Sequence, residues 1–528
     1  MSGGPEPVGR AGPLEVVVVG DGMVGSRLAE EVRRRDPRCA RVRVTVLGAE
    51  PTGAYNRVLL PGLLAGSLTE SDLALGGADG KRRGGRTGGH GGGPAVAVDR
   101  GSRLVTLADG RQLPYDRLVF ATGAVAMVPP VPGVRGGAGA LARGVGVLRT
   151  VVDARRVRRI ADRARARGER MAVLGGGVLG LEAARALAAR GARVTVVHPA
   201  PHVMDRQLGP AAGRMLASAL RRTGVEVRVG VAAVRWKPGE GLHLDDGGML
   251  PAAGLLLCTG ARADTALARA CGLATGPGGI AVDAGLTTSD PAVHALGDCA
   301  DADPGLVQPG WEQAAVLAAR LTGDDPYARY TGTPRVTRLK AAGIELACLG
   351  DPLSADTGAE VLRFEDPTRE RYAKLVLRGD RVTGAILLGL PDAAAGLVQL
   401  YDRGAPAPSD RLALMLGRAL PPESPTGPEA SPDHALVCRC NSVTKGALRT
   451  AWHDGARSAP ELASATRATT GCGGCGPAVE KLAAWLAETD PVPPVAPVLR
   501  TAPPAPTAPA VPTTPALPTA PTTPTATR

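Results

Sequence analysis

The chain has 528 residues, which is too long for one hydrophobic core and suggests three or four domains. Hydrophobic residues make up 44% of it, enough for real cores, whereas aromatic residues make up only 2%. The net charge of +12 would suit an acidic protein or a nucleic acid. Because no recognition helix, aromatic-basic interleaving or nucleic-acid module is present, we predict a solvated arginine-rich surface and no nucleic-acid partner.

The sequence shows no recognisable targeting signal. Residues 1–14 lack the apolar core of a signal peptide, and no run approaches the roughly 20 apolar residues of a membrane span. We therefore expect a soluble, cytoplasmic protein without a membrane partner. In that setting the nine cysteines favour metal binding or catalysis over disulfides. Five cysteines are scattered and are interpreted as ordinary thiols: Cys39, Cys258, Cys271, Cys299 and Cys348.

The first predicted unit begins with four valines, 16–19, that lead directly into Gly20-x-Gly22-x-x-Gly25. Apolar residues then follow at helical spacing, so the glycines lie on a strand-to-helix turn of the kind that binds dinucleotides. Gly20 permits the tight turn, Gly22 lets a pyrophosphate approach the backbone, and Gly25 lets helix and strand pack closely. The N-terminus of the helix faces the phosphate charge.

The rest of this unit is predicted from shorter signals. A second strand, 42–47, ends near Glu50, whose carboxylate can accept hydrogen bonds from an adenosine ribose. The segment from Gly76 to Gly93 is glycine-rich and basic, as expected of a flexible surface insertion. Further strands are expected at 96–99, 104–107 and 115–120, the last ending in Ala121-Thr122-Gly123.

A second predicted unit repeats the strand, glycine turn and helix of the first unit. A buried strand leads into Gly175-x-Gly177-x-x-Gly180, and a helix follows. Two fingerprints in one chain imply two dinucleotides. The next strand ends in His198 instead of Asp or Glu, so this site leaves the choice between NAD and NADP open.

After the second unit the chain is expected to return to the first one. The segment from Leu255 to Gly260 resembles the earlier Ala-Thr-Gly turn and marks this return. A short strand then ends in Gly297-Asp298, and a helix opens near Trp311.

The C-terminal third divides into smaller pieces. Strand signals at 345–349, 373–377 and 385–388 predict an α+β unit. A linker rich in Pro, Ser and Glu follows, and then a small domain from His434 to about Thr489. From Pro491 onward the composition cannot bury enough surface to fold, so we expect disorder.

The four remaining cysteines form a C-x-C pair and a C-x2-C pair within the small domain: Cys438 and Cys440, then Cys472 and Cys475. Four thiolates can hold a [2Fe–2S] cluster or a zinc ion, and the spacing alone leaves both open. Glycines around the second pair free backbone N–H groups to approach the sulfurs.

The two nucleotide folds, with Ala-Thr-Gly and Gly297-Asp298 after them, resemble the two-dinucleotide-binding flavoprotein reductases over roughly residues 14 to 405. In that family the first fold binds FAD and the second binds NAD(P)H. The resemblance implies an FAD site of Gly20, Gly22, Met23, Gly25, Glu50, Arg57, Ala121, Thr122, Gly123, Gly297, Asp298 and Trp311. It implies an NAD(P) site of Gly175, Gly177, Val178, Leu179, Gly180, Glu182, His198 and Gly260.

Roles within these sites follow from the same resemblance. Asp298 is expected at the ribitol, and the helix near Trp311 directs its N-terminus at the flavin pyrimidine, where reduced flavin is anionic. Glu182 near the nicotinamide and Arg57 near the flavin are the catalytic candidates. Disulfide reductases of this superfamily carry a cysteine pair after the first fold. Residues 55–66 contain no cysteine, so we expect no thiol relay at the flavin.

The small domain carries a second resemblance. The segments 437–444 and 470–475 resemble the bacterioferritin-associated-ferredoxin-like [2Fe–2S] domain. This resemblance implies a [2Fe–2S] cluster on all four clustered cysteines. A redox cluster also makes sense beside a flavoprotein reductase, whereas a zinc ion does not.

The order of the domains resembles the N-terminal half of the assimilatory NAD(P)H nitrite reductase large subunit, and even more the electron-transfer subunit of assimilatory nitrate reductase. Segments 54–59, 196–198 and 205–208 fit that group, so His198 is a family-like feature. The insertion after residue 75 and Pro61-Gly62 depart from it. A full-length nitrite reductase would continue into a sirohaem domain with four more cysteines, and no cysteine follows Cys475. We therefore expect no nitrite reduction by this chain itself.

The sequence thus predicts an α/β protein with two Rossmann-like domains, an α+β domain and a small [2Fe–2S] domain. The expected bounds are a disordered N-terminus (1–13), an FAD domain (14–125 and 252–325), an NAD(P)H domain (126–251), an α+β domain (326–420), a linker (421–433), the cluster domain (434–489) and a disordered tail (490–528).

The predicted function is transfer of electrons from NAD(P)H through FAD and the cluster to a separate terminal reductase for nitrate or nitrite. One alternative is a ferredoxin- or rubredoxin-type reductase for another acceptor, such as a monooxygenase. An alternative of another class is an iron-mobilising or docking module with a sensor cluster.

Overall fold

The computed structural model describes residues 12–75, 93–354, 358–418, 428–438, 441, 443–469 and 475–490. Most of the expected N-terminal segment, nearly all of the glycine-rich insertion, part of the linker and the C-terminal tail lie outside these residues. Cys440 and Cys472 lie outside them as well.

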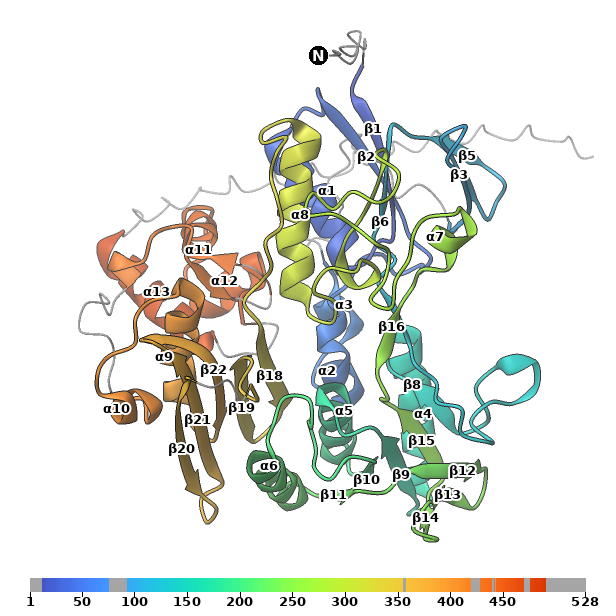
Figure 1. Ribbon diagram of the computed structural model, residues 1–528, viewed down its shortest axis with the longest axis vertical. Helices are drawn as coiled ribbons and strands as arrows, with labels where there is room; N and C mark the ends of the chain where they lie inside the picture. Colours follow the sequence, from blue (N-terminus) through green and yellow to red (C-terminus); the bar gives the residue numbers. More distant parts are fainter. Residues whose placement is uncertain are drawn as a thin grey trace, which may run out of the picture.

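The first sheet is parallel, with strand order β17-β6-β1-β2. Its strands are β1 (Leu14–Val19), β2 (Val42–Leu47), β6 (Arg117–Phe120) and β17 (Val293–Ala295). Helix α1 (Met23–Arg35) joins β1 to β2, because parallel neighbours need a crossover. Helix α8 (Val307–Thr322) packs along α1, as Figure 1 shows. The four valines of β1 are buried, as expected of a strand covered on both faces.

The second sheet is also parallel, with strand order β11-β10-β9-β15-β8. Its strands are β8 (Val145–Val147), β9 (Arg170–Leu174), β10 (Arg193–His198), β11 (Val225–Val229) and β15 (Gly254–Leu257). Its helices are α4 (Val151–Ala166), α5 (Val178–Ala189) and α6 (Pro210–Arg222).

One expected boundary differs here. The chain does not return to the first unit at residue 252, because β15 hydrogen-bonds to β9 and β8 inside the second sheet. The return comes through the antiparallel pair of β7 (Ala124–Ala126) and β16 (Ala261–Ala263), which bridges the two folds. The Ala-Thr-Gly resemblance marked the end of a strand in each fold, not a change of fold.

Small antiparallel sheets and short helices are added to both parallel folds. One antiparallel sheet contains β3 (Ala95–Asp99), β4 (Leu104–Leu107) and β5 (Gln112–Pro114), and another contains β12 (Ala233–Lys237), β13 (Gly241–Leu244) and β14 (Met249–Pro251). The short helices are η1 (Arg57–Leu59), α2 (Leu60–Ala65), α3 (Glu70–Leu73), η2 (Gly137–Gly139), α7 (Ala266–Ala270) and η3 (Gly297–Cys299).

The third sheet is antiparallel, with strand order β18-β19-β22-β21-β20. Its strands are β18 (Val336–Ala341), β19 (Ile344–Gly350), β20 (Glu360–Asp366), β21 (Arg371–Arg378) and β22 (Arg381–Leu388). Helix α9 (Pro391–Arg403) covers one face and α10 (Arg411–Met415) follows it. All three strands expected here from the sequence are present.

The last unit is small and mostly helical. It contains η4 (Pro428–Ala430), β23 (Leu436–Cys438), β24 (Val443–Thr444), α11 (Lys445–His453), α12 (Ala459–Thr466) and α13 (Gly476–Thr489). Figure 1 shows its helices beside α8 and next to the antiparallel sheet. Its own core includes Leu448, Trp452 and Leu482. Across the described residues, none of the helices has the length and apolar character that a bilayer crossing requires.

Candidate functional site

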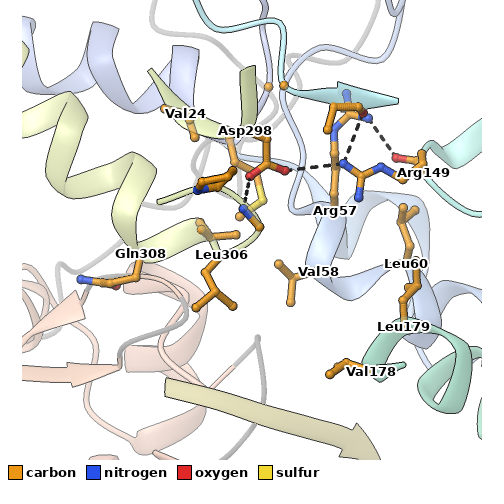
Figure 2. Close-up of a pocket in the computed structure, with 18 of the residues that line it drawn as sticks. Val24, Arg57, Val58, Leu60, Arg149, Val178, Leu179, Asp298, Leu306 and Gln308 are labelled. Atoms are coloured by element: carbon orange, nitrogen blue, oxygen red, sulfur yellow. Dashed lines mark hydrogen bonds and ion pairs between the residues drawn. The ribbon is translucent and has the colours of Figure 1, made fainter. Parts of the chain in front are cut away.

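A cavity of about 1630 Å³ lies where the two parallel folds, the antiparallel sheet and the small helical unit meet. It exceeds the roughly 300–1,000 Å³ of an ordinary small-molecule site, so it has room for more than one ligand. Figure 2 shows Asp298 and Leu306 facing part of it, with Val178 and Leu179 of the second fold across from them.

The first fingerprint forms a cradle that only glycines fit. A Cβ on Gly20 would lie 2.1 Å from the Ala121 carbonyl oxygen, and one on Gly25 would lie 1.9 Å from the Gly20 oxygen. Gly20 also has φ +125°, which favours glycine. Gly22, by contrast, has nothing within 4 Å of a Cβ and lines the cavity. It caps α1 without a side chain, so the first N–H groups of α1 are open to an anion such as a pyrophosphate.

Glu50 lines the cavity at the end of β2, but its carboxylate already has protein partners. It forms an ion pair with Arg57 and accepts a hydrogen bond of 2.7 Å from the Tyr55 hydroxyl. Burial raises the pKa of Tyr55, so this hydroxyl remains a donor. Glu50 is therefore held at a defined place on the wall that the sequence assigned to the adenosine ribose.

Arg149 is a charged wall residue that sequence reasoning missed. Its Nη2 lies 3.6 Å from Oδ2 of Asp298, and its carbonyl accepts a hydrogen bond of 2.9 Å from Arg57 Nη1 (Figure 2). The other carboxylate oxygen of Asp298 accepts from the Gly305 amide at 2.8 Å. No motif covers Arg149, which precedes the capping residue Thr150 of α4; only the fold brings it to the cavity.

The N-terminus of α8 opens into the same cavity. Leu306, Val307 and Gln308 line the cavity, and the helix has no capping side chain, so its first N–H groups face a ligand. The helix begins four residues before Trp311. Trp311 is not among the cavity-lining residues: it is buried and donates its indole N–H to the Met23 carbonyl at 3.0 Å. Trp311 therefore ties α8 to α1.

The second fingerprint repeats the geometry of the first. A Cβ on Gly175 would lie 2.3 Å from the Cys258 carbonyl oxygen, and one on Gly180 would lie 1.9 Å from the Gly175 oxygen. Gly177 has nothing within 4 Å and caps α5 without a side chain. This is again a cradle for a dinucleotide phosphate.

Of the remaining residues assigned to the second site, some line the cavity and others lie outside its lining. Val178, Leu179 and Glu182 line the cavity. His198 and Gly260 are not among its lining residues; His198 Nε2 lies 3.0 Å from Oδ1 of Asp205 at the end of β10.

Glu182 has a partner outside the second fold. It is almost completely buried, and its Oε1 accepts the backbone N–H of Lys340 in β18 at 2.8 Å. The candidate nicotinamide residue is therefore fixed against the antiparallel unit. Pro61, at the start of α2, also lines the cavity and presents an apolar ring where the family resemblance led us to expect a polar side chain.

Two of the four clustered cysteines are described, and both line this cavity. Cys438 ends β23 and Cys475 caps α13, and both are buried. The Thr469 amide donates a hydrogen bond of 3.1 Å to Cys475 Sγ. Backbone donors of this kind suit a thiolate that ligates a cluster. Cys438, Cys475 and the first fingerprint therefore share one cavity.

One dinucleotide cradle on the cavity wall, a second cradle whose helix α5 lines the same cavity, and two buried cysteines in that lining define a flavin- and nicotinamide-dependent oxidoreductase with an added cysteine-containing unit. Residues 14–315 match the pyridine nucleotide-disulphide oxidoreductase family, and the chain belongs to this family. Residues 336–398 match the rubredoxin NAD+ reductase C-terminal domain, and residues 436–485 match the BFD-like [2Fe-2S] binding domain. The chain is an FAD-dependent NAD(P)H oxidoreductase with a [2Fe–2S]-binding domain. The predicted fold class and cofactors are confirmed.

Individual relatives point in the same direction. The chain is 36% identical to the nitrite reductase [NAD(P)H] large subunit of Klebsiella oxytoca, over 88% of this chain and 48% of that protein. It is 30% identical to the assimilatory nitrate reductase electron transfer subunit of Bacillus subtilis, over 91% of this chain and 61% of that protein. The chain thus spans about half the length of the curated relatives it matches. The covalent putidaredoxin reductase–putidaredoxin complex superposes with a TM-score of 0.65 at 26% identity, covering 76% of this chain and 96% of that one.

Proposed function

We propose that the chain passes electrons from NAD(P)H, through FAD and its own [2Fe–2S] cluster, to a separate terminal reductase that acts on nitrate or nitrite. The observation that carries this proposal is the shared cavity. Cys438 and Cys475 line the same space as Gly22 and Asp298 of the first fold. Flavin and cluster would then lie close enough for direct transfer without a thiol relay.

The residues of the first fold fit FAD. Gly20, Gly22 and Gly25 would hold the pyrophosphate, Glu50 the adenosine ribose and Asp298 the ribitol. When bound, the flavin supplies the step from a hydride pair to single electrons. Val178, Leu179 and Glu182 of α5 line the facing wall, which suits a nicotinamide brought against that flavin.

Charge in this cavity is arranged for an anionic cofactor. The uncapped N-terminus of α8 would stabilise negative charge at the pyrimidine end of the reduced flavin. Arg57 and Arg149, which form ion pairs with Glu50 and Asp298, would also hold cofactor phosphates. Glu182, which is fixed by the Lys340 amide, would orient the nicotinamide.

A cysteine substitution tests the order of the carriers. In anaerobically prepared protein, Cys438→Ser should lose the cluster and all transfer to a protein acceptor, yet keep NADH oxidation with ferricyanide, because the flavin lies upstream of the cluster. Iron, sulfide and zinc analysis, together with stopped-flow bleaching of the flavin, measures both halves. Cys271→Ser is the matched control, since Cys271 is half-buried and is not among the cavity-lining residues.

Two results would contradict the proposal. One is zinc without iron or sulfide in the wild-type protein. The other is a failure of flavin reduction by NADH in Cys438→Ser while FAD remains bound.

A second candidate function has its own support. The antiparallel unit matches the rubredoxin NAD+ reductase C-terminal domain, and the chain is 30% identical to a nitric oxide reductase FlRd-NAD(+) reductase of Vibrio vulnificus, over 85% of that protein. A reductase of this type would serve a small redox protein. Rapid reduction of rubredoxin or ferredoxin by the Cys438→Ser variant would favour this candidate, because such a route bypasses the cluster.

A further inference from the structure

The chain contains only two asparagines, Asn56 and Asn441, and they are hydrogen-bonded to each other. Asn56 belongs to the first fold and Asn441 to the cluster unit, 385 positions apart. Asn56 Nδ2 donates to Asn441 Oδ1 at 3.2 Å. Asn56 is completely buried and Asn441 is half-buried, so this bond is partly shielded from water.

The neighbouring backbone groups fix the orientation of both amides. Asn56 Oδ1 accepts the Val58 N–H at 3.0 Å, which leaves its Nδ2 to face Asn441. Asn441 Nδ2 donates to the Arg467 carbonyl, which leaves its Oδ1 to face Asn56. These bonds turn the Asn56 Nδ2 donor and the Asn441 Oδ1 acceptor toward each other.

The two ends of this bond lie next to the redox groups. Asn56 caps η1, and the following residues Arg57 and Val58 line the cavity on the flavin side. Asn441 directly follows Cys440 and is three residues after Cys438. Arg467, whose carbonyl Asn441 binds, leads into the second cysteine pair and lies near the carboxylate of Glu30 in α1. The bond thus joins the wall of the flavin site to a residue of the cluster unit that lies three positions after Cys438.

We propose that the Asn56–Asn441 pair is a positioning device that holds the cluster unit docked over the flavin in the geometry that electron transfer requires. This inference rests on the proposed function. Among the residues of the cluster unit that the structure describes, Leu436, Val437 and Ala478 line the cavity beside Cys438 and Cys475, and these three are apolar and lack direction. The pair of amides, of which Asn56 is completely buried, supplies direction. NADH delivers an electron pair as hydride, and the pair leaves through the cluster one electron at a time, so the docked pose must serve each transfer.

Asn56→Asp tests the pair without removing the cap of η1. The aspartate keeps the acceptor for the Val58 N–H, but it loses the donor and turns a carboxylate oxygen toward Asn441 Oδ1. Asn56→Ser also caps a helix but is too short to reach Asn441. Cluster reduction is followed by the cluster absorbance after NADH is mixed with anaerobic protein. We expect its rate to fall about fivefold in the serine variant, which corresponds to the loss of one hydrogen bond, and to fall further in the aspartate variant. Flavin reduction should be unchanged.

Hydrogen exchange supplies a readout independent of activity. Peptides 57–65 and 443–453 lie on the two sides of the contact. Their amide hydrogens should exchange about fivefold faster in both variants than in the wild type. Thr69→Ala is the matched control. It removes the cap of α3, whose Leu73 carbonyl accepts the Asn56 N–H at 2.7 Å, and it leaves the asparagine pair intact.

The outcomes separate the two proposals. If wild-type flavin does not reduce the cluster, the proposed function fails. If wild-type transfer is fast and both Asn56 variants reduce the cluster at the wild-type rate, only the positioning role fails. If Thr69→Ala slows the cluster as much as Asn56→Ser, the effect belongs to the local loop and the pair has no special role.

Discussion

At the scale of single residues, the fingerprint glycines are required for two different reasons, the packing of the fold and the binding of a ligand. Gly20 and Gly25 have protein backbone where a Cβ would stand, so the fold itself requires them. Gly22 and Gly177 have open space there, so only a ligand restricts them. Substitution at the second pair therefore reports on binding without disturbing the packing of the fold.

We expect Gly22→Ala to weaken FAD retention about tenfold, because a methyl group would block the approach of the pyrophosphate to a helix N-terminus that contributes up to ~2 kcal/mol. Gly177→Ala should instead raise the KM for the nicotinamide nucleotide and leave the FAD content unchanged. Gly209→Ala is the control, since Gly209 also caps a helix, α6, without a side chain and has nothing within 4 Å. FAD content after gel filtration and the KM for NADH measure these effects. Loss of FAD from Gly209→Ala would show that the caps act through stability alone.

At the scale of elements, the short strand β17 contains a buried titratable group. His294 pairs with Val119 of β6 and is 6% exposed. Burial, with a smaller effect of Arg117, lowers its pKa to about 4. In the unfolded chain the pKa returns to about 6.5. Above that value both states are neutral and His294 has no effect on stability. As the pH falls below it, the unfolded state takes up the proton first and the fold loses stability.

The resulting prediction concerns the pH dependence of the first fold. Between pH 7.5 and pH 5, His294 should cost about 2 kcal/mol of stability, and the loss should level off near pH 4. His294→Val should remove this component, so its unfolding midpoint should fall less on acidification than that of the wild type. Thermal melts of both proteins at the two pH values measure the difference. Equal acid sensitivity in the two proteins would contradict the assignment.

At the scale of the whole molecule, the redox site belongs to no single unit. The cavity takes its walls from two parallel folds, an antiparallel sheet and the cluster unit. Contacts across unit boundaries hold that arrangement, among them Glu182 with the Lys340 amide, Arg149 with Asp298, and Asn56 with Asn441. An enzyme assembled in this way can deliver electrons, but delivery still needs an acceptor.

We therefore expect these 528 residues alone not to convert nitrite with NADH. That reduction needs a metal centre to hold nitrogen-oxide intermediates, and the C-terminal cysteines are assigned to the cluster. Of the other five cysteines, burial raises the pKa of Cys258 and of Cys348 to about 12, so they remain thiols and poor ligands. Ammonium assays should stay at background until a terminal reductase is added. Ammonium from contaminant-free protein would reveal a site that we have missed.

Much of this protein could be predicted from its sequence because the signals are local. Gly20 and Gly25 are required by contacts within one β-α turn, and the strands of the antiparallel unit follow the apolar pattern of short segments. The cysteine pairs are likewise local motifs, and the BFD-like match confirms the domain that they indicated. Sequence was thus sufficient for fold class, cofactors and enzyme class.

Only the tertiary structure decided what depends on contacts between distant segments. The tertiary structure shows that β15 belongs to the second sheet, that Trp311 is buried against the Met23 carbonyl, and that Arg149 lies at the cavity wall beside Asp298. It also joined Asn56 to Asn441. None of these follows from periodicity, because a side chain that completes a cavity or bridges two units is selected by a partner far along the chain.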